Sequence, residues 1–77
     1  MSNHYSEFMY NERHRWGYMT EQQLLTRLNR ITRPGKLEAF LHMAVEVGNR
    51  ALMRAGSNRA RRLGLGQLVL PSWANNL

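Results

Sequence analysis

The sequence has no cysteine, no aspartate, only two prolines and a single lysine among its 77 residues. Without cysteine, neither a disulfide framework nor a thiolate metal site can form. A chain of this size buries only about 60% of the surface that it exposes when unfolded, and a disulfide or a metal is the common way to compensate. The fold is therefore expected to depend on compact helix packing, on a partner, or on self-association as a homodimer.

Long apolar runs are also missing. No window approaches the roughly 20 apolar residues that a membrane span requires. The first twenty residues contain Glu7, Glu12 and Arg13 and have no continuous apolar stretch of the kind found in a signal peptide. We therefore expect a cytoplasmic protein with no membrane partner, and the lack of cysteine is compatible with a reducing compartment.

Residues that carry catalysis are scarce. His4, His14 and His42 have no aspartate or cysteine for company, and no two of them have the spacing of a metal-binding pair. No serine lies in a nucleophile motif, and no glycine pattern of the phosphate-cradling type is present. We expect a protein that is not an enzyme and that holds no metal or cofactor.

Helical periodicity begins at Thr20. Gln23 follows three residues later, which is the spacing of a capping box. The apolar residues that follow recur every three or four positions and predict a helix over about 20–32. Pro34 ends this pattern, because the residue before a proline avoids the helical conformation. The apolar residues of this helix are Leu24, Leu25, Leu28 and Ile31.

A broader apolar face predicts a second helix over about 36–55. Gly56 is well placed to cap its carboxyl end. A short third helix is expected near 58–63, followed by an extended apolar segment at 68–70 that Pro71 terminates. The predicted class is all-α: a helical hairpin of 20–32 and 36–55, a short third helix, and an arm at each end.

All 77 residues are expected to form one small domain, with an aromatic and basic arm at 1–18, a helical core at 19–63 and a C-terminal arm at 64–77. Within the first arm, Ser6–Trp16 could form a short helix that Gly17 ends. An arm that becomes ordered only on a partner is an equal alternative. In the C-terminal arm, Leu68–Leu70 and Trp73 are expected to fold back on the hairpin.

Positive charge is unevenly distributed. The net charge is +6, carried by ten arginines and one lysine against five glutamates. Residues 1–46 carry six positive and five negative charges, whereas residues 47–77 carry five arginines and no carboxylate. Arginine offers a planar donor fork that suits phosphates, carboxylates and base edges. The predicted binding residues are Arg50, Arg54, Asn58, Arg59, Arg61 and Arg62, with secondary contacts from Arg13, Arg15 and Trp16.

Two functions fit this charge pattern. In the first, segment 50–62 binds DNA or RNA through phosphate contacts. In the second, the chain is an inhibitor or adaptor that binds an acidic surface of a larger host protein, as small accessory proteins of phages and mobile elements do. A solvated basic face without a ligand is the third interpretation.

The aromatic residues near the N-terminus also fit either a nucleic-acid or a protein partner. Tyr5, Tyr10 and Trp16 could stack on unpaired bases or take part in a protein interface. For Trp16, covering the small core is the preferred interpretation.

One further pattern involves Ala44 and Gly48, whose spacing is common at the bend of a helix-turn-helix unit. A bend there would place residues 49–62 in a recognition helix. Against this, no turn residues follow Gly48, and Arg54 falls where an apolar residue would anchor the second helix. We therefore favour a continuous helix with a small-residue seam that packs against helix 20–32 or forms a dimer contact. The seam comprises Ala44, Gly48, Ala51, Ala55 and Gly56.

Overall fold

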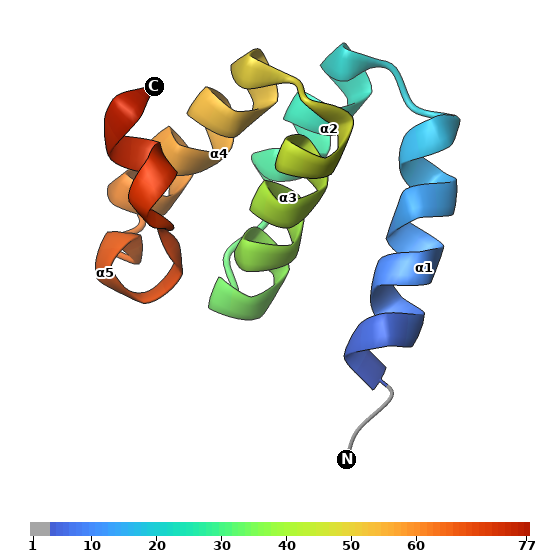
Figure 1. Ribbon diagram of the computed structural model, residues 1–77, viewed down its shortest axis with the longest axis horizontal. Coiled ribbons are helices and arrows are strands. Elements are labelled where there is room, and N and C mark those ends of the chain that lie inside the picture. Colours follow the sequence, from blue (N-terminus) through green and yellow to red (C-terminus); the bar gives the residue numbers. More distant parts are fainter. Residues whose placement is uncertain (1–3) are drawn as a thin grey trace.

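The structure is a computed structural model that describes residues 4–77, with side chains from Ser6 onwards. Every regular element in that range is helical, which confirms the all-α class. Figure 1 shows α1 on one side of α2 and α3, and α4 with the C-terminal segment on the other. The elements are α1 (His4–Gly17), α2 (Glu21–Leu28), α3 (Pro34–Val47), α4 (Arg50–Arg62), α5 (Gly66–Val69) and the 3₁₀ helix η1 (Ser72–Asn76).

The predicted capping box at the start of α2 is confirmed. The hydroxyl of Thr20 accepts from the Gln23 amide at 3.1 Å, and the Gln23 side chain accepts from the Thr20 amide at 2.9 Å. The helix ends at Leu28, earlier than the predicted residue 32. The amide of Ile31 donates to the Leu28 carbonyl, three residues back, so the chain tightens into turns instead of continuing as an α-helix.

The prediction of one helix over 36–55 is wrong, because the chain breaks after Val47. Gly48 takes the left-handed conformation with φ 71°, which glycine adopts without steric cost. Its amide donates to Val45 O, and the Asn49 amide donates to Ala44 O, which together make a Schellman motif. The apolar pattern did not reveal this break, because residues on both sides of it face the same core.

Helix α4 therefore includes the residues predicted as a separate short helix at 58–63. Gly56, predicted as a C-terminal cap, is instead buried within this helix. A Cβ atom added there would lie 2.7 Å from Leu41 Cδ2 and 3.2 Å from Phe40 Cδ1. The absence of a side chain lets α4 approach α3 closely. Only part of the predicted seam is used in this way, since Gly48 and Ala51 are exposed.

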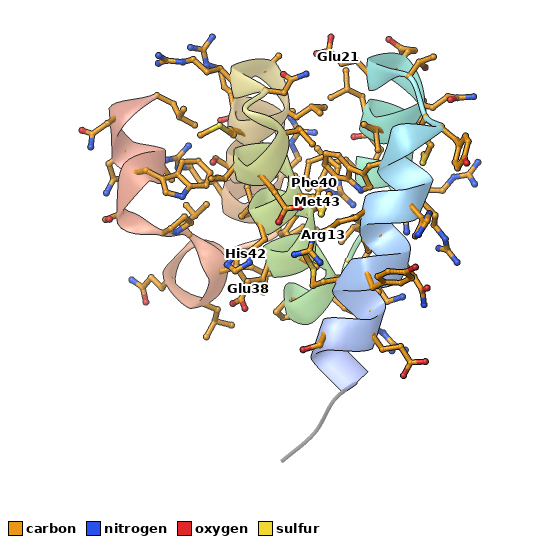
Figure 2. All side chains as sticks on the ribbon, turned by 45° about the vertical axis from the view of Figure 1, so that its right-hand side comes forward. Arg13, Glu21, Glu38, Phe40, His42 and Met43 are labelled. Atoms are coloured by element: carbon orange, nitrogen blue, oxygen red, sulfur yellow. The ribbon has the colours of Figure 1, made fainter. Side chains whose placement is uncertain are left out.

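Both terminal segments contribute to the core. Met9 and Trp16 of α1 are buried, and the ring of Trp16 lies 5.0 Å from that of Phe40. Phe40 and Met43 extend from α3 into the space beside α1 (Figure 2).

The C-terminal segment folds back as expected. Val69 is buried and Trp73 packs against the core, although Leu68 is 70% exposed. The segment 68–70 was expected to be extended, but most of it belongs to α5. The amides of Leu68 and Val69 both donate to the Leu65 carbonyl, which closes a helical turn where an extended strand would have no partner.

Two contacts orient α2 relative to α4. Asn49 Nδ2 donates to Glu21 Oε1 at 2.8 Å, which joins the starts of the two helices. Arg59 donates to the Ile31 carbonyl, which lies just beyond the end of α2. Because both contacts join residues 28 positions apart, α2 and α4 run side by side in the same direction.

The radius of gyration is 11.9 Å, close to the roughly 11.5 Å expected for a compact domain of this length. None of the helices in residues 4–77 is long and apolar enough to cross a membrane.

Candidate nucleic-acid interface

The two faces of α4 differ sharply in character. Leu52, Gly56 and Ala60 recur every four residues, are buried, and pack the helix against the core. On the opposite face, the exposed side chains span an arc of about 120° around the helix axis, given a rotation of roughly 100° per residue. We call this face the basic stripe; it comprises Arg50, Arg54, Asn58, Arg61 and Arg62.

The basic stripe contains no ion pair with any carboxylate that the structure describes. The arginines that do pair with glutamates lie elsewhere, at Arg13, Arg15 and Arg27. Within the stripe, Arg61 donates to Asn58 Oδ1 at 3.4 Å and to the Ala74 carbonyl at 3.3 Å. This second bond ties the C-terminal segment to α4.

Arg50, Arg54 and Arg62 make no hydrogen bond or ion pair with any described residue. Their donors are available to an external acceptor. Arg50 also lies in the first turn of α4, where the helix dipole disfavours a positive charge. Its position therefore does not stabilise the helix. The arginines of the last turn, in contrast, have a favourable interaction with the dipole.

Arg59 does not belong to the stripe, although the sequence placed it there. Its Nε and Nη2 atoms donate to the Ile31 carbonyl at 3.2 and 3.1 Å, and the side chain is partly buried. Adjacent helical residues differ by about 100° in direction, so Arg59 faces α2 while Asn58 faces solvent. Arg59 is a structural residue that fixes α4 to the end of α2.

The predicted secondary contacts also lie apart from the stripe. Arg13 makes a two-point ion pair with Glu46, at 2.6 and 3.0 Å. Trp16 is buried, and Arg15 lies 3.7 Å from the buried carboxylate of Glu12. All three are on α1, which Figure 1 shows on the far side of α3 from α4.

The ion pair between Arg13 and Glu46 affects the titration of the carboxylate. The hydrogen bond from Arg13 and its positive charge, with a smaller effect of His42, hold the pKa of Glu46 below its usual value. Glu46 is thus fully ionised near neutral pH and joins α1 to α3.

The aromatic residues of α1 are divided between core and surface. Tyr10 is exposed and contacts the edge of the His14 ring at 4.8 Å, and Tyr18 is also exposed. The side chain of Tyr5 lies outside the described residues. With Trp16 in the core, the stacking surface suggested by the sequence loses its largest ring.

The break between α3 and α4 falls where the helix-turn-helix hypothesis placed it. Asn49 is the turn residue that the hypothesis lacked, and its side chain caps α4 by accepting from the Leu52 amide at 3.1 Å. The objection based on Arg54 does not hold, because other residues anchor α4. The combination of glycine followed by asparagine was the signal in the sequence that could have revealed this boundary.

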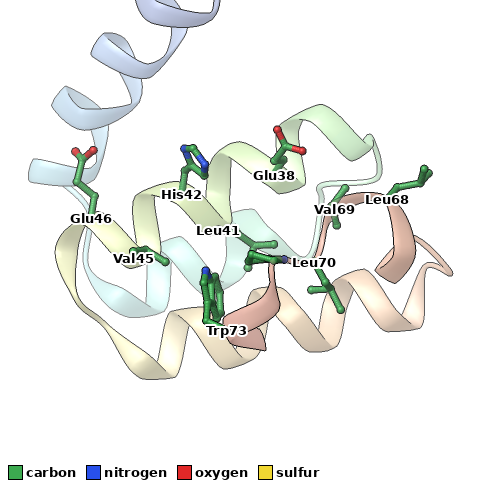
Figure 3. Close-up of a pocket in the computed structure, with 10 residues that line it drawn as sticks. Glu38, Leu41, His42, Val45, Glu46, Leu68, Val69, Leu70 and Trp73 are labelled. Carbon is green, nitrogen blue, oxygen red and sulfur yellow. The ribbon is translucent and has the colours of Figure 1, made fainter. Parts of the chain in front are cut away.

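The described residues also form cavities outside the stripe, among them a larger and a smaller one. The larger, of about 580 Å³, opens between α3 and the C-terminal segment. Leu41, Leu70 and Trp73 form its apolar walls, and Glu38 and Glu46 lie along α3 at its edge (Figure 3). The smaller, of about 360 Å³, is bounded by α1, α2 and the start of α3. No cluster of three potential metal ligands occurs within the described part of the chain.

Comparison with known proteins gives no match, since no family model, curated protein or solved structure is significantly similar to this chain.

Proposed function

We propose that this protein binds double-stranded DNA through the basic stripe of α4 and catalyses no reaction. The observation that carries the proposal is the exposed face of α4, where Arg50, Arg54 and Arg62 have no partner among the described residues. The carboxylates of the chain are engaged elsewhere or lie on other helices. A basic helical face without acidic neighbours is the electrostatic signature of a polyanion site.

The dimensions of α4 favour a DNA duplex. A helix of 13 residues is about 20 Å long, and its stripe extends about 18 Å, close to five base-pair steps. The major groove of B-DNA is wide enough to admit an α-helix. The major groove of duplex RNA is too narrow for side chains to read. Asn58, near the middle of the stripe, has a side chain of the kind that pairs with an adenine edge.

The test is duplex DNA binding measured by fluorescence anisotropy over a range of salt concentrations. If the four arginines of the stripe each contact a phosphate, the logarithm of the affinity falls with the logarithm of salt with a slope near −3.6. Replacing Arg54 with Gln should weaken binding and make the slope shallower by about 0.9.

Arg15→Gln is the matched control. It removes the same charge from an exposed position on α1 and should leave the slope unchanged. Equal effects of the two variants, or no binding at micromolar protein in low salt, would contradict the proposal.

A second candidate is binding to an acidic protein surface, as an inhibitor or adaptor. It is favoured by the apolar cavity beside α3, near which Val45 and Leu68 are exposed, because apolar surface of this kind suits a protein partner better than phosphate. Pulldowns from a nuclease-treated lysate would compare the wild type with a charge-reversed stripe (R50E/R54E/R62E). A stoichiometric acidic protein that is lost with the reversed stripe would favour this second function.

A further inference from the structure

The smaller cavity, between α1, α2 and the start of α3, has a composition unlike the rest of the surface. Four cationic residues line it: Arg27, Arg30, Arg33 and Lys36. Glu12 is the one carboxylate in its lining, and two arginines already neutralise that carboxylate. The cavity therefore carries a net positive charge in a partly enclosed space.

Two of the four cations contact residues of α1. Arg27 Nη2 donates to Glu12 Oε2 at 2.8 Å, which fixes the guanidinium against α1. Lys36 lies with its Nζ 5.6 Å from the centroid of the Phe8 ring. Ile31, which also lines the cavity, is fixed from the other side by Arg59. Because Arg27 is already fixed, less side-chain freedom is lost there when a ligand binds.

A donor that lacks an acceptor lies beside the cavity. Arg27 Nη1 is buried and has no hydrogen-bond partner among the described residues, which is a costly condition for a charged donor. Helix α3 begins at the same place with Arg33 as its N-cap, and no side chain caps it. An anion in the cavity would be attracted by the positive charges of Arg27, Arg30, Arg33 and Lys36.

We propose that this cavity is a phosphate-binding site, separate from the basic stripe. The ligand class is a phosphate group with free oxygens, carried either by a nucleic-acid terminus or by free inorganic phosphate. Three or more cations around one small cavity match the charge of such a group better than that of a monovalent carboxylate. The proposal does not depend on DNA binding by α4.

The test is a titration of ¹⁵N-labelled protein with sodium phosphate, with sodium chloride used to hold the ionic strength constant. We expect saturable shifts of the backbone amides of Gly35 and Lys36. The variant R30Q/R33Q/K36Q changes only exposed side chains and should bind phosphate at least about tenfold more weakly. Its thermal midpoint would show that the fold is retained.

The matched control is R50Q/R54Q/R62Q, which removes the same charge from the stripe. It should bind phosphate like the wild type while losing affinity for DNA. A failure of the DNA proposal can therefore be distinguished from a failure of the phosphate proposal. Linear, unsaturable shifts, or equal loss of phosphate binding in both variants, would overturn the cavity proposal.

A short oligothymidylate with and without a 5′-phosphate identifies the source of the ligand. Tighter binding of the phosphorylated form, lost only in R30Q/R33Q/K36Q, would assign the cavity to a nucleic-acid terminus. Inorganic phosphate that binds as tightly as the phosphorylated form, and competes with it, would assign the cavity to the free ion.

Discussion

At the scale of single residues, the arginines of α4 differ in what they contact. Arg59 donates twice to a backbone carbonyl at the end of α2, whereas Arg62, three positions on, makes no hydrogen bond or ion pair with any described residue. Their charge is the same and their local sequence is similar. Only the direction in which each side chain leaves the helix separates a structural arginine from one that is free to bind.

This difference gives the first prediction. Arg59→Ala should lower the free energy of unfolding by about 1–3 kcal/mol, because it removes charge-assisted hydrogen bonds to a partly buried carbonyl. Arg62→Ala should change it by no more than about 0.5 kcal/mol. Urea denaturation of both variants checks this. Similar stability of the two would show that the contact with Ile31 does not hold α2 and α4 together.

The second prediction concerns Glu46. Its pKa is held below the usual value by Arg13, so the ion pair stabilises the fold at pH values above the carboxyl range. The stabilisation is lost as pH falls through the lowered pKa of the folded state. The difference in unfolding free energy between wild type and Glu46→Gln should therefore be constant near neutral pH and disappear in acid. High salt should reduce it, and a difference that persists unchanged in acid would contradict this role.

At the scale of elements, the division between α3 and α4 depends on two adjacent residues. Gly48 permits the left-handed conformation that ends α3, and Asn49 caps the start of α4. Without the break, α4 could not fold back beside α2, since a straight helix from 34 to 62 would be about 43 Å long. The longest dimension of the molecule is 32 Å.

The third prediction tests this cap. Asn49→Ala should destabilise the protein by about 1 kcal/mol, because the Leu52 amide loses its acceptor. Asn49→Ser retains an acceptor and loses only the bond to Glu21, so it should cost no more than about 0.5 kcal/mol. Thermal unfolding followed by circular dichroism measures both. If serine is as harmful as alanine, the bond to Glu21 and not the cap sets the stability.

At the scale of the whole molecule, α1 makes few contacts with the other helices. Trp16 supplies the largest side chain among those of α1 that pack into the core. Its ring packs against Phe40, and the side chain is 7% exposed. A domain of this length has a stability of about 4–12 kcal/mol. The loss of one large aromatic residue from a small core therefore removes a large fraction of the free energy of unfolding.

The fourth prediction follows. Trp16→Ala should lower the free energy of unfolding by about 3–5 kcal/mol, whereas Tyr18→Ala, at a position 87% exposed, should have little effect. Trp16→Phe should cost much less than Trp16→Ala, since it retains ring packing and removes an Nε1 donor that has no partner in the described part. Equal losses for Phe and Ala would indicate that the indole makes a contact beyond ring packing.

The arrangement of charge is also a property of the whole molecule. The basic stripe lies on α4, the cationic cavity lies between α1 and α3, and Glu38 and Glu46 lie along α3 beside the apolar cavity. The basic stripe follows from counting charges along the sequence, whereas the cavities are formed by residues of several elements. Arg30, Arg33 and Lys36 belong to the half of the sequence that is close to electrical balance, yet they gather at one cavity.

The sequence by itself determined the helical class, the cap at Thr20, and the position of Arg50 and Arg54 on one helical face. These follow from local rules: side-chain hydrogen bonds to neighbouring amides, and a fixed angle per residue along a helix. The acid-free segment after Glu46 is visible in the sequence for the same reason, since it requires only counting.

Tertiary structure alone decided three other features. It placed Gly56 against Leu41 and made it a packing residue instead of a cap. It turned Arg59 away from the stripe, and it placed the cations of α2, of the α2–α3 connection and of α3 around the cavity beside α1. Each depends on which helices are neighbours in space, and the apolar periodicity of a single helix does not specify its neighbours.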